Sequence, residues 1–379
     1  MGSLGTEQLQ LNEKHALALQ NLYERLVQQS QTYIGYPNNQ LLNNSDLAPF
    51  LDLVINNIGD PFVGNLGINT CDFELQVLSF YRQLFKIDEN EYWGYVTRGG
   101  TEGNMFGTYV GRELYPTGMV YYSSNTHYSV RKIVKLLRID ACAVDSLPNG
   151  EIDYAKFATE IEKNPDRPVI FIANIGTTMK GAIDSLEKVI KMFETLGVKK
   201  YYIHCDAALL GPMLPFVKGA PELSFDLPIG SISVSGHKFL GSPIPCGVVL
   251  TRSHLTKSIK GHIDYIGSYD STIFGSRDGF SVLVMWKQIK LLGMEGFKRW
   301  TDHCMSMTYY AMYKLKEINW PAWKNDYSNI VMIRRPVDFV CKKWHLATEA
   351  DQAHLILMPN STATEIDLLI EDLIAHKNC

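Results

Sequence analysis

The feature that most constrains the fold is an alternation, between about Asn56 and Arg252, of short apolar runs with stretches of helical spacing. The run "VIFIAN" is apolar up to its last residue and lies between Pro168 and the turn-like "IGTTMKG". Similar runs are "MVYYS", which precedes the helical "YSVRKIVKLLRI", and "YYIHCDAA", "SISVSG" and "GVVLTR". Apolar runs separated by helices indicate strands buried on both faces in βαβ units. The sequence therefore predicts an α/β domain with a mostly parallel sheet, with its ligand at the carboxyl ends of the strands.

The regions on either side of this alternation have a different pattern. An amphipathic first helix places Leu11, Leu19, Leu22 and Leu26 near one face and is expected to pack on another element. A Gly-, Pro- and Asn-containing linker follows it. After about residue 260 come long helical stretches, two shorter strand-like runs and a final helix. We therefore divide the chain into a helix and linker (1–55), a large α/β domain (56–260), and interface helices with a small α+β domain (261–379).

One helix start within the large domain has a recognisable capping pattern. Asp184 precedes "SLEKVIKMFETLG", and Glu187 follows three residues later. This spacing predicts Asp184 as the N-cap, with Glu187 as its reciprocal partner in a capping box.

Composition excludes several classes of function. A net charge of −4 gives no electrostatic reason to bind nucleic acid or an anionic membrane. No apolar run approaches the roughly 18 residues of a membrane span. The seven cysteines are scattered and form no C-x-x-C pair, which is typical of reduced cytoplasmic thiols. The ten histidines include no H-E-x-x-H motif, and those of "GHID" and "QAHL" stand alone, so no metal site is predicted.

Two segments that precede helices could contact a ligand. In "YVTRGGTEGNMFG" (95–107), the N–H groups of Gly100 and Thr101 and the Thr101 hydroxyl could hold a phosphate, although a tight turn with a helix cap explains the motif equally simply. In "NTHYS" (125–129), His127 could stack on an aromatic cofactor or merely cap the next helix.

Two charged residues follow apolar strands. Asp206 in "IHCDAAL" ends a strand, where a carboxylate needs a positive partner or serves as a helix cap. Lys238 in "SVSGHKFLG" comes after the next strand, beside Ser235 and His237, and a partly buried lysine readily becomes a nucleophile for carbonyls. Pyridoxal 5'-phosphate uses all these features together: a lysine, a carboxylate, a phosphate cradle and a stacking group.

These segments also resemble a known family. Together with "NIGTTMKGAID" and "GSRDG", they are similar to the group II pyridoxal-phosphate decarboxylases, and most similar to bacterial histidine decarboxylases and plant serine decarboxylases. The resemblance runs from "IGYP" at 34–37 to the C-terminus. It implies the PLP-dependent transferase fold type I, which combines a large domain containing a mostly parallel seven-stranded sheet with a smaller C-terminal α+β domain. It also implies a homodimer with shared active sites.

The resemblance implies a role for each matching residue. Lys238 would hold the cofactor, Asp206 would pair with its pyridine nitrogen, and His127 and Ala208 would lie on opposite faces of its ring. The phosphate would be held by Gly100, Thr101, Ser235 and His237. Ser276 of "GSRDG" would reach the partner subunit's site, and Arg277 would serve the same interface or a substrate carboxylate. In "HIDYIGSYD", Tyr265 is the candidate proton donor to the substrate α-carbon, and an ordinary surface or interface tyrosine is the alternative.

Two departures from the family pattern bear on the substrate. Arg98 stands where the family usually has Asn, and Phe280 stands where it has His. The short chain favours L-histidine as substrate over L-serine, giving histamine and CO₂ rather than ethanolamine and CO₂. Other reactions of the same cofactor, and a cofactor-free binding module on the same fold, are the alternatives.

Overall fold

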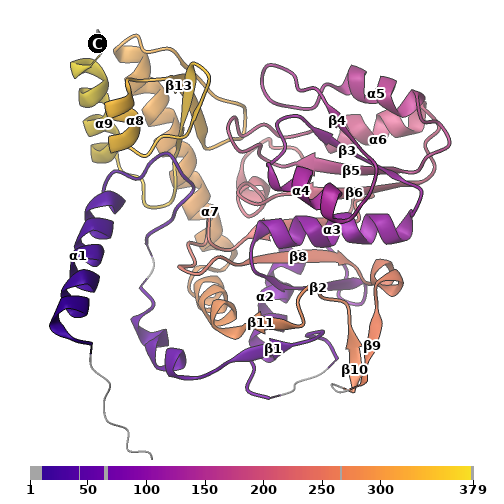
Figure 1. The fold of residues 1–379 in the computed structure, drawn as a ribbon. Helices are drawn as coiled ribbons and strands as arrows, with labels where there is room; N and C mark the ends of the chain where they lie inside the picture. Colours follow the sequence, from indigo (N-terminus) through magenta and orange to yellow (C-terminus); the bar gives the residue numbers. More distant parts are fainter. Residues whose placement is uncertain (1–10, 42, 64–66, 265–266, 377–379) are drawn as a thin grey trace, which may run out of the picture.

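The computed structural model describes residues 11–41, 43–63, 67–264 and 267–376. Its centre is a seven-stranded sheet of order β2-β8-β7-β6-β5-β3-β4 (Figure 1). Only β8 runs against its neighbours, so the predicted mostly parallel sheet is confirmed. The strands are β2 (Tyr92–Thr97), β3 (Met119–Ser123), β4 (Ala141–Val144), β5 (Val169–Asn174), β6 (Tyr201–Asp206), β7 (Ser231–Ser235) and β8 (Gly247–Arg252).

Helices cover both faces of this sheet, which explains the unbroken apolar runs. In β5, Phe171 packs in one core cluster, with side chains of α2, α5 and α6. Its neighbours Ile170 and Ile172 belong to another cluster, with side chains of α3 and α4. Successive strand residues point to opposite faces, so a strand covered on both sides needs apolar residues at both parities. The helices are α2 (Cys71–Leu84), α3 (Gly100–Leu114), α4 (Ser129–Leu136), α5 (Tyr154–Glu162) and α6 (Leu186–Thr195).

The C-terminal part of the chain has its own antiparallel sheet of order β12-β13-β15-β14 and its own core, which includes Trp344, Leu355 and Leu369. The long helix α7 (Gly279–Glu317), broken at Gly293, leads into it. The remaining elements are β12 (Ala322–Trp323), β13 (Ile330–Arg334), α8 (Asp338–Lys343), β14 (Thr348–Glu349), β15 (Gln352–Ile356) and α9 (Ala363–Ala375). This is the small α+β domain expected of fold type I.

Two short strand pairs lie outside the main sheets. They join β1 (Asn56–Ile58) to β11 (Ser276–Asp278) and β9 (Gly261–Ile263) to β10 (Ser268–Asp270). The division of the chain at residues 55 and 260 stays a prediction. Within the described ranges, no helix combines the length and apolarity needed to cross a membrane.

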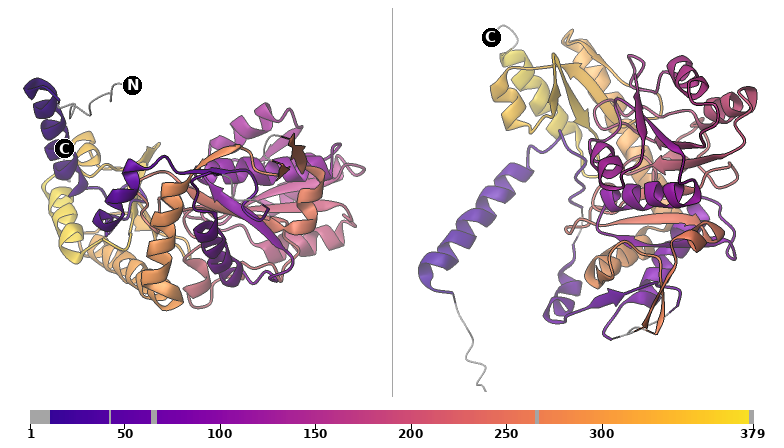
Figure 2. Two further views of the ribbon diagram at one scale, coloured as in Figure 1. Left: turned by 90° about the horizontal axis from the view of Figure 1, so that it is seen from below. Right: turned by 45° about the vertical axis from the view of Figure 1, so that its right-hand side comes forward.

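The first helix stands away from the rest of the chain (Figure 2). The predicted helix forms as α1 (Glu13–Ser30), capped by Asn12, whose side chain accepts a hydrogen bond from His15 N. None of its residues is buried, and Leu19 and Leu26 are 56% and 52% exposed. The described chain therefore contains no element that covers the apolar side chains of α1.

The capping prediction for α6 is wrong. The N-cap is Ser185, whose side chain accepts a hydrogen bond from Lys188 N. Asp184 is buried and turned inward, where its carboxylate accepts hydrogen bonds from Ile152 N and from both nitrogens of Asn174. Burial raises the pKa of Asp184 to about 6. Asp184 therefore braces the end of β5 instead of capping a helix.

Candidate functional site

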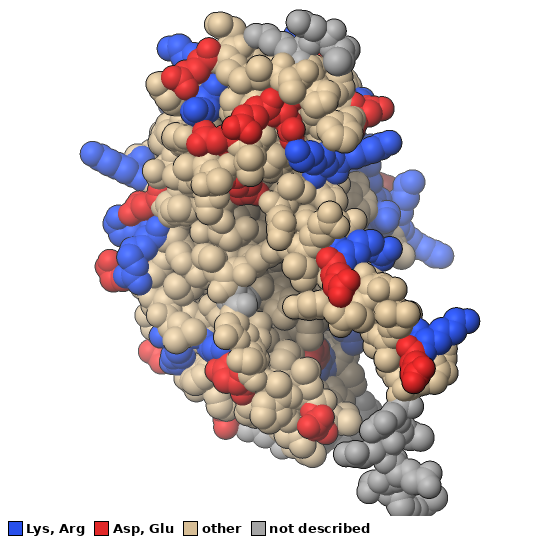
Figure 3. Space-filling model, turned by 90° about the vertical axis from the view of Figure 1, so that its left-hand side faces the viewer, with Lys and Arg blue, Asp and Glu red and all other residues tan. Residues whose placement is uncertain are grey.

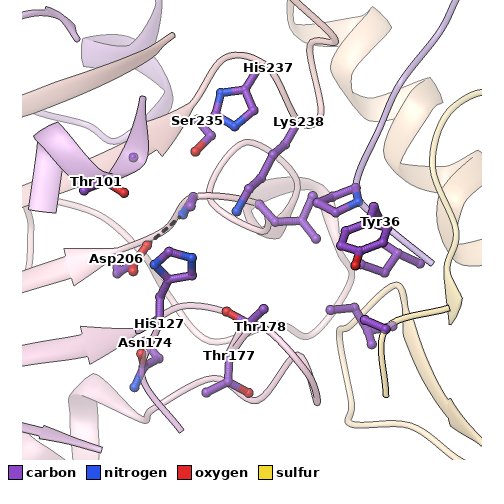
Figure 4. A pocket seen from close by; sticks show the side chains of 18 of the residues that line it. Tyr36, Thr101, His127, Asn174, Thr177, Thr178, Asp206, Ser235, His237 and Lys238 are labelled. Atoms are coloured by element: carbon purple, nitrogen blue, oxygen red, sulfur yellow. Dashed lines mark hydrogen bonds between the residues drawn. The ribbon is translucent and has the colours of Figure 1, made fainter. Parts of the chain in front are cut away.

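A cavity of about 160 Å³ lies at the carboxyl ends of β5, β6 and β7 (Figure 4). We call its two sides the sheet wall and the far wall. The sheet wall consists of Gly100, Thr101, Asn104, His127, Asp206, Ala208, Ser235, His237 and Lys238. The far wall consists of Tyr36, Pro37, Ile330, Ala347, His354 and Ile356, from the N-terminal linker and the small domain. The loop after β5 lies between them and contributes Thr177 and Thr178.

The start of α3 has the geometry of an anion cradle, and its use for a phosphate stays a prediction. Gly99, with φ of 134°, turns the chain from β2 into the helix, whose first N–H groups are free to bind a ligand. A Cβ at Gly100 would lie 2.8 Å from the hydroxyl oxygen of Ser235, so only glycine fits here without a shift. His237 is held in place by its Nδ1, 3.0 Å from the carbonyl oxygen of Cys246. The positive helix end and the hydroxyls of Thr101 and Ser235 together suit a phosphate.

Asp206 is positioned by a buried chain of polar side chains that the sequence analysis missed. Asn104 Nδ2 donates to Asp206 Oδ2 over 2.7 Å, so Asn104 Oδ1 faces the other way, 3.0 Å from His204 Nε2. His204 is fully buried, and burial lowers its pKa to about 4, which leaves the ring neutral at neutral pH. His204 Nε2 must therefore carry the proton, while Nδ1 accepts from the Ser231 hydroxyl at 2.7 Å. His204 and Asp206 lie two residues apart on β6, so their side chains point to the same face. This spacing is the signal in the sequence that could have linked them.

Lys238 extends into the cavity toward Asp206 (Figure 4). Burial lowers the pKa of its amine, and the charge of Asp206 opposes this. A lowered pKa raises the fraction of uncharged amine, the form that attacks carbonyls.

His127 supports the start of α4 and also lines the cavity, so its position is compatible with both roles that the sequence left open. Its Nδ1 lies 2.7 Å from the Ser129 hydroxyl and accepts from Ser129 N over 3.3 Å, so it supports the start of α4. The ring also lines the cavity beside Asp206 (Figure 4). Burial lowers its pKa, which favours the neutral ring that stacking requires.

Three other residues singled out from the sequence are not among the described residues that line the cavity. Ser276 is exposed, where Asn56 Nδ2 donates to its hydroxyl over 3.3 Å. Arg277 is buried in an ion pair with Glu74, so within its own chain it reaches no substrate carboxylate. Arg98 donates to the carbonyl oxygen of Ser276 over 2.8 Å. Tyr265 lies outside the described residues.

The far wall was also missed by sequence analysis, apart from the general resemblance of "IGYP" to the family. Its residues come from positions 36–37 and 330–356, which no local pattern connects. His354 had been noted only as an isolated histidine. The residue is 2% exposed and faces the cavity from β15.

The sheet wall fits one cofactor chemistry. A buried amine, a carboxylate held by an amide, a flat imidazole and an anion cradle around one cavity match the aldehyde, pyridine nitrogen, ring and phosphate of pyridoxal phosphate. The fold and the site thus define a fold type I pyridoxal-phosphate enzyme.

Comparisons with known proteins give the family. The family described as pyridoxal-dependent decarboxylase conserved domain matches residues 107–320. The chain is 45% identical to a histidine decarboxylase of Vibrio campbellii, over 90% of this chain and 89% of the relative. It is 43% identical to serine decarboxylase 1 of Oryza sativa subsp. japonica, over 93% of this chain and 74% of the relative. The crystal structure of L-methionine decarboxylase from Streptomyces sp. 590 has the same fold, with a TM-score of 0.88 over 97% of this chain and 96% of that one, at 24% identity. The chain belongs to the pyridoxal-dependent decarboxylases.

Proposed function

We propose that this enzyme decarboxylates L-histidine to histamine and CO₂. The observation that carries the cofactor chemistry is Lys238 facing Asp206 in a cavity that also contains an anion cradle, and membership of the pyridoxal-dependent decarboxylases supports the reaction class. For the substrate, the support is that this chain and the Vibrio campbellii histidine decarboxylase cover each other almost end to end. L-Serine, giving ethanolamine, is the second candidate, because the 43% identity to the rice serine decarboxylase is nearly as high as the identity to the histidine decarboxylase.

Each residue of the sheet wall has a proposed task. Lys238 would hold the aldehyde carbon of the cofactor, and the cradle of Gly100, Thr101, Ser235 and His237 would hold its phosphate. His127 and Ala208 would lie on opposite faces of the ring. Bound pyridoxal phosphate supplies an electron sink for the pair released when the bond from Cα to the carboxylate breaks.

Asp206 and Tyr265 would handle protons. Asp206, with Oδ2 bonded to Asn104, would keep a proton at the pyridine nitrogen and so stabilise the negative charge that develops. One proton must reach Cα to replace the departing CO₂, and Tyr265 is our candidate donor. Tyr265→Phe should slow turnover and raise the yield of aldehyde side product, whereas an unchanged rate with no extra aldehyde would remove Tyr265 from this role.

We also propose that the enzyme acts as a homodimer in the cytoplasm. The uncovered leucines of α1 need a partner surface. The face shown in Figure 3 carries most of its charged side chains toward its rim and few across its middle. Ser276, exposed on its own chain, would reach the partner subunit's site. Light scattering of the purified protein should give twice the chain mass of 42.9 kDa.

The cysteines found free among the described residues fit a reducing compartment such as the cytoplasm.

The test of the function combines absorbance and product analysis. After addition of pyridoxal phosphate, the protein should show a visible band that borohydride abolishes, and peptide mapping should find the cofactor on Lys238. Captured CO₂ with each amino acid then separates histidine from serine. A keto acid without CO₂ would indicate a different reaction, and no band at all would indicate a binding module.

A further inference from the structure

His354 connects three segments of the chain at the far wall. It lies on β15 of the small domain and its ring is buried. Nε2 lies 3.0 Å from the carbonyl oxygen of Gly35, and Nδ1 lies 2.9 Å from the carbonyl oxygen of Met179. Each ring nitrogen faces a backbone carbonyl from a different part of the chain. Burial lowers the pKa of His354 and favours the neutral ring, which donates a hydrogen bond to one of these carbonyls and packs against the other.

Both of these acceptors lie next to cavity residues. Gly35 directly precedes Tyr36 and Pro37, and Met179 directly follows Thr177 and Thr178. A shift of either carbonyl would therefore move side chains that line the cavity. The sheet wall is held by other hydrogen bonds. Asn104 and His204 position Asp206, and the carbonyl oxygen of Cys246 positions His237.

Other bonds keep the two segments attached without fixing these carbonyls. Ile356 N donates to the carbonyl oxygen of Ile34 over 2.8 Å, and Asn325 Nδ2 donates to that of Lys180 over 2.9 Å. Loss of the His354 ring should therefore loosen the segments locally and leave the domain folded. The imidazole is suited to this place because one rigid ring contacts both segments, donating to one carbonyl and packing against the other.

We propose that His354 is a positioning residue that sets the substrate side-chain end of the cavity, by holding the Tyr36–Pro37 segment and the Thr177–Thr178 loop at a fixed separation. This proposal rests on the proposed function and identifies the part of the site that measures the length of the substrate. On this proposal a long side chain such as imidazolylmethyl would reach the far wall, whereas the hydroxymethyl of serine would be too short to do so.

The test compares His354→Ala, which removes both contacts, with His354→Gln, which retains one N–H donor group. His303→Gln is the matched control, because His303 also contacts a backbone carbonyl, that of Ser361 at 2.8 Å, but does not line the cavity. For L-histidine we expect KM to rise about tenfold or more in His354→Ala and less in His354→Gln, with kcat within about twofold. The affinity for pyridoxal phosphate and the KM for any L-serine turnover should change little.

Hydrogen–deuterium exchange of the holoenzyme provides a readout independent of activity. His354→Ala should speed exchange in peptides covering 34–37 and 176–181 but not in those covering 99–107 or 203–209. An unchanged KM for histidine, or a loss of cofactor affinity equal to the change in KM, would overturn the proposal. If wild-type enzyme releases no CO₂ from histidine, the proposed substrate fails, and the exchange pattern still decides whether His354 holds the two segments.

Discussion

The two walls of the cavity are built in different ways. The sheet wall takes its residues from the last positions of β6 and β7 and from the segments that directly follow β2, β3, β6 and β7. The far wall is assembled from a linker near residue 36 and from strands some 300 residues later. Substitutions in a wall made from strand ends also disturb the sheet. In a wall made from separate segments, each segment can be substituted while the sheet stays intact. This contrast assigns the chemistry to the sheet wall and substrate selection to the far wall, and it can be tested.

The largest effect is expected at the centre of the sheet wall. Asp206→Ala should lower kcat by about three orders of magnitude or more, because no carboxylate then keeps the pyridine nitrogen protonated. The fold, followed by circular dichroism, should not change. Near-normal turnover in this variant would show that Asp206 does not serve the electron sink.

A smaller effect on kcat is expected at Asn104, which positions Asp206. Asn104→Ala removes the donor to Asp206 Oδ2 and leaves His204 Nε2 without its acceptor. Losing a hydrogen bond to a charged group should lower kcat about tenfold to a hundredfold, with a shifted absorbance of the bound cofactor. Thr108→Val is the control, since the Thr108 hydroxyl bonds only the backbone oxygen of Asn104 among the contacts found. Equal kinetics in the two variants would contradict the role of the Asn104 side chain.

At the far wall we expect a change in KM and not in kcat. Ala347→Leu adds volume at the substrate side-chain end and should raise KM for histidine about tenfold, with a smaller effect on serine. Ala322→Leu, in the same small sheet but away from the cavity, should leave both values unchanged. If Ala347→Leu weakens pyridoxal phosphate binding instead, the assignment of the two walls is incorrect.

The last prediction concerns the stability of the fold behind the sheet wall, where we expect no effect on substrate selection. The pKa of Asp184 is raised from 3.8 to about 6, so its contribution to stability is present below pH 3.8 and is lost as pH rises through 6. That difference corresponds to about 3 kcal/mol. Asp184→Asn cannot titrate, so urea midpoints measured from pH 4.5 to 7.5 should fall less steeply in the variant than in wild type. Asp153→Asn, at the exposed cap of α5, is the control. Parallel pH curves for wild type and Asp184→Asn would contradict this account.

The sequence predicted the sheet and the sheet wall because both depend on local order. Lys238, Asp206 and His127 each follow an apolar strand, and parallel strands bring their carboxyl ends to one edge. Asn104 and His204 belong to the same segments but were overlooked, because a side chain that orients another one has no motif of its own. The cap of α6 was misassigned because Asp184 and Ser185 both suit a helix start, and only burial against Asn174 separates them. Gly35 and His354 could not be paired by any local pattern, because the contact between them exists only once the small domain has folded.

The glycine of "IGYP" has a practical consequence. Gly35 lies so close to the backbone of His345 and Leu346 that any side chain there would collide with it. Residues 34–37 therefore pack closely against the small domain, although they lie near the opposite end of the chain. A chimera that exchanged only the C-terminal region between two relatives would join mismatched surfaces here. To transfer the substrate preference of one relative to another, a chimera would need to exchange residues 34–37 together with the C-terminal region.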